Sequence, residues 1–76
     1  MIAHLERKQP GRSCFRFYRL EVARDLFGGW VLVRSWGRIG TRGRDRIDRF
    51  ASAEAARRAQ ERHCAAKARR GYSAVN

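Results

Sequence analysis

The sequence predicts an α+β domain, in which a small antiparallel β-sheet carries one α-helix from the C-terminal half of the chain on one face. Three observations predict this fold class. From Cys14 to Ala23 apolar and polar residues alternate, as strands with one buried face require, and Trp30 to Arg38 is rich in strand-forming residues. After Ser52 the pattern becomes that of a capped helix. Strands followed by a late helix are typical of a sheet with the helix packed on it.

The composition limits the chain to one domain and indicates an anionic partner. With 76 residues, 43% of them hydrophobic, the chain is expected to form a single domain over residues 1–76 with a modest core. The net charge is +11, from 18 basic and 7 acidic residues, and only Lys8 and Lys67 among the basic residues are lysines. Such an excess of arginine favours a polyanion, above all nucleic acid, as the partner.

The N-terminal half of the chain is predicted to form strands joined by turns. Met1–Lys8 fits a short first strand, and the turn residues of Gln9–Arg12 end it. Cys14–Ala23 is the second strand, and Trp30–Arg38 is the longest strand candidate. Between them, the glycine pair of Asp25–Gly29 supplies the positive φ that a tight hairpin turn needs.

The two faces of the second strand differ in character. Tyr18, Leu20 and Val22 make one apolar face, whereas Phe15 and Phe17 lie among polar residues on the other face. Either both faces of the sheet are partly covered at this strand, or a β-bulge near Phe17 redirects the side chains. The sequence leaves these two alternatives open.

The stretch from Arg34 to Arg44 holds the candidate binding residues. Glycine recurs at every third position from Gly37 and lets the backbone bend tightly or approach a ligand, while arginine is the side chain best suited to fork onto phosphate. Trp36 can stack on a sugar or base, although a tryptophan near a strand end can equally belong to the core. In a regular strand Arg34, Trp36 and Arg38 share a face. The candidate nucleic-acid-binding residues are Arg34, Trp36, Gly37, Arg38, Gly40, Thr41, Arg42, Gly43 and Arg44.

Two further strands are predicted in the C-terminal half. The chain turns over Ile39–Arg44 and can return as a strand over Arg46–Phe50, whose acidic residues can pair with neighbouring arginines. Tyr72–Val75 fits a short last strand at the edge of the sheet. Three or more antiparallel strands therefore precede or flank the helix.

The helix is predicted to run from about Ala53 to Arg70. Ser52 is a good N-cap, and Gly71 suits the position just after the C-terminal end. One stripe of small and polar side chains is expected to face the sheet, so the sheet must provide most of the large core residues. His63 is expected to pack or cap rather than to bind a ligand. The stripe consists of Ala56, Ala59, Gln60, His63 and Lys67.

No pattern in the sequence predicts catalysis, a cofactor or a metal site. A carboxylate pair, a Ser-His-Asp set and a metal-ligand cluster are lacking at usable spacing, so we expect a protein that is not an enzyme. His4, Cys14, His63 and Cys64 lack the short spacing of zinc modules, and the two cysteines predict no disulfide. No apolar run approaches the roughly 20 residues of a membrane span, so we expect a cytoplasmic protein, with association with the nucleoid left open.

These residues resemble the WGR domain family. The family's signature is matched by Trp36-Gly37-Arg38-Ile39-Gly40, with Phe17-Tyr18-Arg19-Leu20 upstream, Leu26-Phe27-Gly28-Gly29-Trp30 before the signature strand, and Lys67 to Gly71-Tyr72 closing the helix. The similarity covers about residues 14–72 and implies the family's antiparallel sheet with one packed helix. Small bacterial proteins that consist of little else carry this domain, and the chain resembles one of those.

The resemblance also implies roles for the signature residues. WGR domains occur in DNA-damage-dependent poly(ADP-ribose) polymerases, where the signature tryptophan, here Trp36, stacks on the sugar of a terminal nucleotide at a strand break while basic residues hold the backbone. The signature arginine, here Arg38, contacts companion domains in those enzymes. No such domain and no transferase segment fits into 76 residues. Arg38 is therefore free for phosphate or for a separate protein partner.

The residues and the resemblance together favour a nucleic-acid-binding domain. The leading hypothesis is binding to DNA ends, nicks or single-to-double-strand junctions without sequence readout. The alternative is a module that docks onto a repair or regulatory protein. RNA binding is a further alternative, because arginine and an aromatic ring serve single strands of either kind. The sequence leaves the oligomeric state open.

Overall fold

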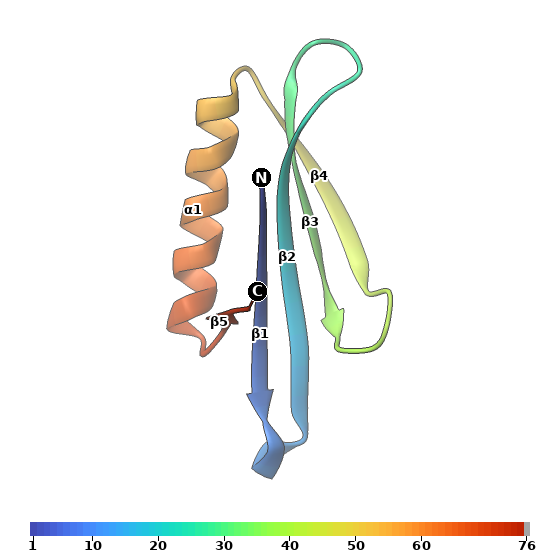
Figure 1. The fold of residues 1–76 in the computed structure, drawn as a ribbon, viewed down its shortest axis with the longest axis vertical. Coiled ribbons are helices and arrows are strands. Elements are labelled where there is room, and N and C mark those ends of the chain that lie inside the picture. Colours follow the sequence, from blue (N-terminus) through green and yellow to red (C-terminus); the bar gives the residue numbers. More distant parts are fainter. Residues whose placement is uncertain (76) are drawn as a thin grey trace.

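The computed structural model describes residues 1–75, which form one antiparallel sheet with a single α-helix against it (Figure 1). The predicted α+β class is confirmed. Along the chain, the described elements are β1 (Ile2–Gln9), the 3-10 helix η1 (Pro10–Arg12), β2 (Cys14–Arg24), β3 (Trp30–Arg38), β4 (Arg44–Phe50), α1 (Ala53–Arg69) and β5 (Ser73–Ala74).

The strands are ordered β4-β3-β2-β1-β5, and each is antiparallel to its neighbours. Pairing of β2 with β3 is continuous over residues 16–24 of β2, so no bulge redirects Phe17. Tyr18 lies opposite Trp36, and both side chains point to the face on which α1 packs, which we call the covered face. Phe15 and Phe17 lie on the other face, here called the open face. Phe17 is partly buried there, and its ring stacks on His4 with ring centres 6.3 Å apart.

The core lies between α1 and the covered face. Leu20 of β2 and Leu32 of β3 are completely buried, and small residues of the helix, Ala56 and Ala59, pack against them. Gln60 is buried as well, and its amide nitrogen donates to the carbonyl oxygen of Leu20 at 3.0 Å, which satisfies a polar group in the core. The predicted helix stripe is confirmed, with its last two members, at positions 63 and 67, only partly buried.

The ends of the helix form as the sequence predicts. The hydroxyl oxygen of Ser52 accepts a hydrogen bond from the amide of Ala55 at 3.1 Å, and Gly71 follows the helix with a φ of 93°. The start of β4 differs from the prediction, because pairing with β3 begins at Arg44 rather than at position 46. The β3–β4 turn is tight enough that Arg44 already lies opposite Trp36.

The surroundings of His63 predict that the stability of the domain depends on pH. Burial, followed by the charge of Arg34, holds the pKa of His63 below its ordinary value of 6.5, while Asp48 acts against them and Arg62 and Lys67 act with them. As the pH falls below about 6.5, the unfolded chain takes up the proton first, so the folded state loses stability. We expect the melting temperature to decrease as the pH is lowered from about 7.5 to about 5.5.

The His63→Gln variant tests this dependence, with His4→Gln on β1 as the matched control. Melting curves followed by circular dichroism should show a flatter pH profile for His63→Gln, and the control should keep the profile of the parent chain. Equal profiles for all three proteins would show that His63 is not the group responsible.

Candidate nucleic-acid interface

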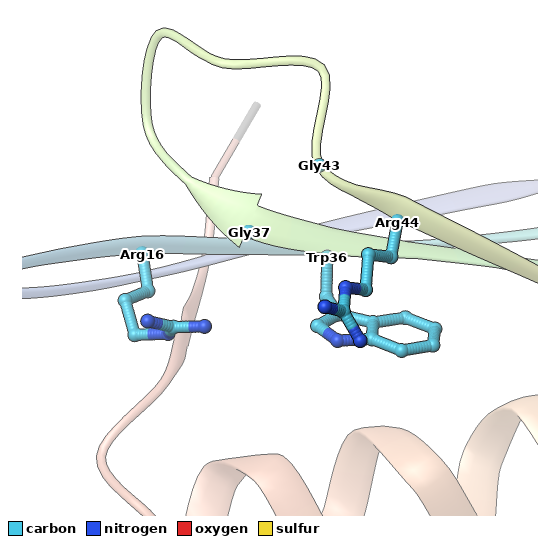
Figure 2. Close-up of a pocket in the computed structure, with 5 residues that line it drawn as sticks. All are labelled: Arg16, Trp36, Gly37, Gly43 and Arg44. Atoms are coloured by element: carbon cyan, nitrogen blue, oxygen red, sulfur yellow. The ribbon is translucent and has the colours of Figure 1, made fainter.

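An open pocket of about 530 Å³ lies where β3 ends and β4 begins. Three adjacent strands each contribute one functional side chain to it: Arg16 from β2, Trp36 from β3 and Arg44 from β4. Figure 2 shows that all three project from the same side of the sheet, toward α1. The backbone of Gly37 and Gly43 completes the lining. The pocket therefore presents an aromatic ring between two cationic side chains.

The ring of Trp36 is held by aromatic neighbours on the covered face. It stacks on Tyr18, with ring centres 5.8 Å apart and planes inclined by 15°. Tyr18 is buried, meets the edge of Tyr72, and has the Lys67 ammonium 4.5 Å above its ring. Trp36 is itself partly buried against the core cluster and also lines the pocket. Trp36 can therefore pack against the core and also contact a ligand, since a ring anchored in this way is already oriented for stacking.

The glycines fix the turn in two different ways. Gly40 and Gly43 have positive φ values of 92° and 73°. Gly37 does not have a positive φ. A Cβ atom on Gly37 would lie 2.8 Å from the Cα of Gly43, and a Cβ atom on Gly43 would overlap the carbonyl oxygen of Trp36. Close backbone contact, rather than conformation alone, requires glycine at positions 37 and 43.

The predicted arginines divide into paired and unpaired groups. Arg34 lies outside the pocket lining, and its side chain is only 15% exposed. Its guanidinium donates to a carboxylate oxygen of Asp48 at 3.0 Å and to the hydroxyl of Tyr18 at 3.4 Å. Burial would raise the pKa of Asp48, but hydrogen bonding from Arg46 and the charge of Arg34 outweigh it and hold that pKa low. Arg34 is therefore committed to an internal ion pair.

The remaining arginines of the stretch are exposed. Within residues 1–75, no carboxylate pairs with the guanidinium of Arg16, Arg38, Arg42 or Arg44. Arg38 lies directly opposite Arg16, a lining residue of the pocket, across the β2–β3 pair. The hydroxyl of Thr41 donates to the carbonyl oxygen of Arg38 at 2.7 Å, so Thr41 stabilises the turn from within. Of the predicted residues, those that the structure brings together in the pocket lining are Trp36, Gly37, Gly43 and Arg44.

Two cations outside the predicted set of binding residues belong to these surroundings. Arg16 lines the pocket directly, and Lys67, in the last turn of α1, lies above the ring of Tyr18, which stacks on Trp36. Burial, and then the charges of Arg70, Arg34 and Arg16, lower the pKa of Lys67. Cations that lie this close repel one another, and an anion that binds among them reduces the repulsion. The register of the β2–β3 hairpin indicates Arg16, because counting residue pairs outward from the Asp25–Gly29 turn places Arg16 opposite Arg38.

Other kinds of site are not evident in the described part of the chain. Among residues 1–75, no group of three or more His, Cys, Asp or Glu side chains is arranged to hold a metal ion. Cys14 and Cys64 are both free thiols, and burial raises the pKa of Cys64. No helix in the same range is long and apolar enough to cross a membrane.

Comparison with known proteins identifies the family. The chain is 38% identical over 69 residues to the uncharacterised protein y4dW of Sinorhizobium fredii, covering 91% of this chain and 34% of that protein. Its fold is similar to that of a crystal structure of a protein from Bacteroides fragilis, with a TM-score of 0.79 and 25% identity, covering the whole of this chain and 20% of that one. The chain thus spans about a third of its curated relative. The family model of the WGR domain matches residues 1–76, and the chain therefore belongs to the WGR domain family.

Proposed function

We propose that this WGR domain binds DNA at ends, nicks or single-to-double-strand junctions, without reading the base sequence. WGR is a non-catalytic domain known in nucleic-acid-binding contexts. The observation that carries the proposal is the pocket, in which the anchored Trp36 ring lies between the unpaired guanidinium groups of Arg16 and Arg44.

This arrangement suits an interrupted duplex better than a continuous one. In an intact helix the bases are stacked on one another, whereas a terminal nucleotide leaves a sugar or base face free to stack on Trp36. Arg16 and Arg44 then hold the flanking phosphates, and exposed Arg38 and Arg42 extend the cationic surface. The groups that line the pocket, one tryptophan ring and two guanidinium groups, suit stacking and phosphate contacts, which carry no direct information on base sequence. Binding is therefore independent of base sequence.

Arginine variants test the phosphate contacts. Arg16→Ala and Arg44→Ala should each weaken binding to every duplex and reduce the log-log salt slope by about 0.9, the value for one phosphate neutralised. The matched control is Arg34→Ala, which removes an internally paired charge and should lower the melting temperature while leaving the salt slope unchanged. Fluorescence anisotropy between about 50 and 200 mM salt measures all three slopes. Unchanged slopes for both pocket variants would rule out these contacts.

The choice of nucleic acid is tested by comparing substrates. Blunt, nicked and 5′-phosphorylated duplexes should bind more tightly than the hairpin-closed duplex. Two duplexes of unrelated sequence should bind with similar affinity. A difference of more than about tenfold between two equal-length sequences, roughly 1.4 kcal/mol, contradicts backbone reading. Tighter binding of the matched RNA would assign the same pocket to RNA instead.

The exposed apolar tip of the β2–β3 hairpin favours docking onto a protein as a second candidate function. Leu26 and Phe27 are 97% and 88% exposed, and their turn lies at the opposite end of the sheet from the β3–β4 turn (Figure 1). Arg38 is exposed as well, and offers a contact to an acidic surface. An apolar docking surface gives a shallow salt dependence, whereas several phosphate contacts give a steep one. The salt slope therefore separates the two functions.

A further inference from the structure

Strand β4 forms a bare edge of the sheet. It is the terminal strand in the order β4-β3-β2-β1-β5, and within residues 1–75 no other strand pairs with its outer side. A strand in this position presents a row of unpaired backbone N–H and C=O groups, to which another strand can add. Most side chains of β4 are exposed, including Ile47 at 59%.

The sequence of β4 is complementary to itself when two copies run antiparallel. Ile47 is the midpoint of the strand Arg44–Phe50. Pairing centred on Ile47 places Asp45 opposite Arg49 of the second copy and Arg46 opposite Asp48 of the second copy, and symmetry repeats both pairs. Opposite charges directly across an antiparallel pair are favourable, and like charges are unfavourable. On the open face the two isoleucines meet each other.

Other registers of the same two strands bring like charges together. A shift by one residue places Arg46 opposite Arg49 in one direction and Asp45 opposite Asp48 in the other. Centring the pairing on Arg46 or on Asp48 places that residue opposite itself. Parallel pairing in register matches every charge with its own copy. The Ile47-centred arrangement is therefore selected by charge, and it uses the strand over its full length.

We propose that two copies of this chain associate through β4, joining their sheets into one continuous sheet centred on Ile47. The two-fold axis that relates antiparallel strands stands perpendicular to the sheet, so both α1 helices and both Trp36 pockets lie on the same side of the joined sheet. The net charge of +11 on each copy opposes association at low salt. At about 0.15 M salt this repulsion is screened beyond about 8 Å, while the directly opposed pairs remain in contact.

Charge reversal at positions 45 and 49 tests both the interface and its register. Asp45→Arg alone, and Arg49→Asp alone, each create two like-charge pairs in a homodimer and should weaken self-association by about tenfold or more. An equimolar mixture of the two variants restores two opposite-charge pairs and should form a heterodimer. Asp45 has no ion pair within residues 1–75, so its reversal leaves the monomer intact. Arg49 pairs with Asp25, so a melting curve checks the fold of that variant.

Sedimentation equilibrium and native mass spectrometry from micromolar to millimolar concentration measure the outcome. Arg57→Asp is the matched control for Arg49→Asp, because it makes the same change of charge on an exposed position of α1 and should remain dimeric. The proposal is overturned by a parent chain that is monomeric at millimolar concentration, by single variants that dimerise as the parent does, or by two folded variants whose mixture stays monomeric.

Discussion

Replacing Trp36 with leucine should leave the domain folded and abolish the proposed preference for open DNA ends. The indole lines the pocket beside Arg16 and Arg44, and stacking of a base or sugar on such a ring contributes about 1 to 3 kcal/mol. Leucine retains part of the packing against the core but not the flat surface. The expected cost in unfolding free energy is about 1 to 2 kcal/mol, because the stacked pair with Tyr18 is lost. Alanine would cost more, since Trp36 is partly buried.

Two duplexes of the same sequence, one open and one closed by hairpins at both ends, provide the measurement. The parent chain should bind the open duplex more tightly, and Trp36→Leu should bind both alike. Trp30→Leu is the matched control, because Trp30 also packs against the core from β3 and contacts Arg24, outside the pocket lining. It should lose stability and keep the preference for ends. A folded Trp36→Leu protein that still prefers open ends would exclude stacking on this residue.

Replacing Gly43 with alanine should destabilise the domain more than any other single glycine change in the β3–β4 turn. The positive φ of 73° costs an L-residue about 1 to 2 kcal/mol. The added Cβ would also overlap the carbonyl oxygen of Trp36 and lie 2.9 Å from the ring of Phe17, so the turn must move. We expect a loss of about 3 kcal/mol or more, which in a domain of this size lowers the melting temperature by roughly 12 °C or more.

The other glycines form an internal series for the same melting experiment. Gly40→Ala encounters strain from its φ of 92° but open space, so about 1 kcal/mol is expected. Gly37→Ala has no such strain but meets the Cα of Gly43 at 2.8 Å, and should fall between Gly40→Ala and Gly43→Ala. Gly11→Ala meets nothing within 4 Å and is the control. If Gly43→Ala and Gly11→Ala had the same melting temperature, the close contact in the turn would be disproved.

Most of the fold could be predicted because its signals are local. The helix bounds follow from Ser52 and Gly71, whose capping geometry depends on neighbours within a few residues. Strand alternation and the Asp25–Gly29 turn likewise require no knowledge of distant contacts. The sequence predicts a start of β4 that is two residues too late, because a close backbone contact between Gly43 and Trp36 lets pairing resume at Arg44, and a contact across strands leaves no local pattern.

The candidate site was less predictable, because it is assembled across three strands. A linear stretch could provide Trp36 and Arg44, but Arg16 enters only through the register of β2 with β3. The sequence predicts that acidic residues of Arg46–Phe50 can pair with neighbouring arginines, but it does not predict that Asp48 pairs with Arg34, because that choice depends on the register of β3 with β4. Which arginines are free is thus a property of the folded sheet rather than of the sequence.

The backbone contact inside the β3–β4 turn also has a consequence for protein engineering and for divergence of the family. Gly37 and Gly43 bring main chain against main chain, and the ring of Trp36 packs on Tyr18, so neither contact uses the exposed side chains at positions 38 and 42. Those positions can be randomised in a library while the stacking surface stays where it is. Under the proposed function, selection for a different nucleic-acid end or a different partner can therefore act on positions 38 and 42, with both glycines held constant.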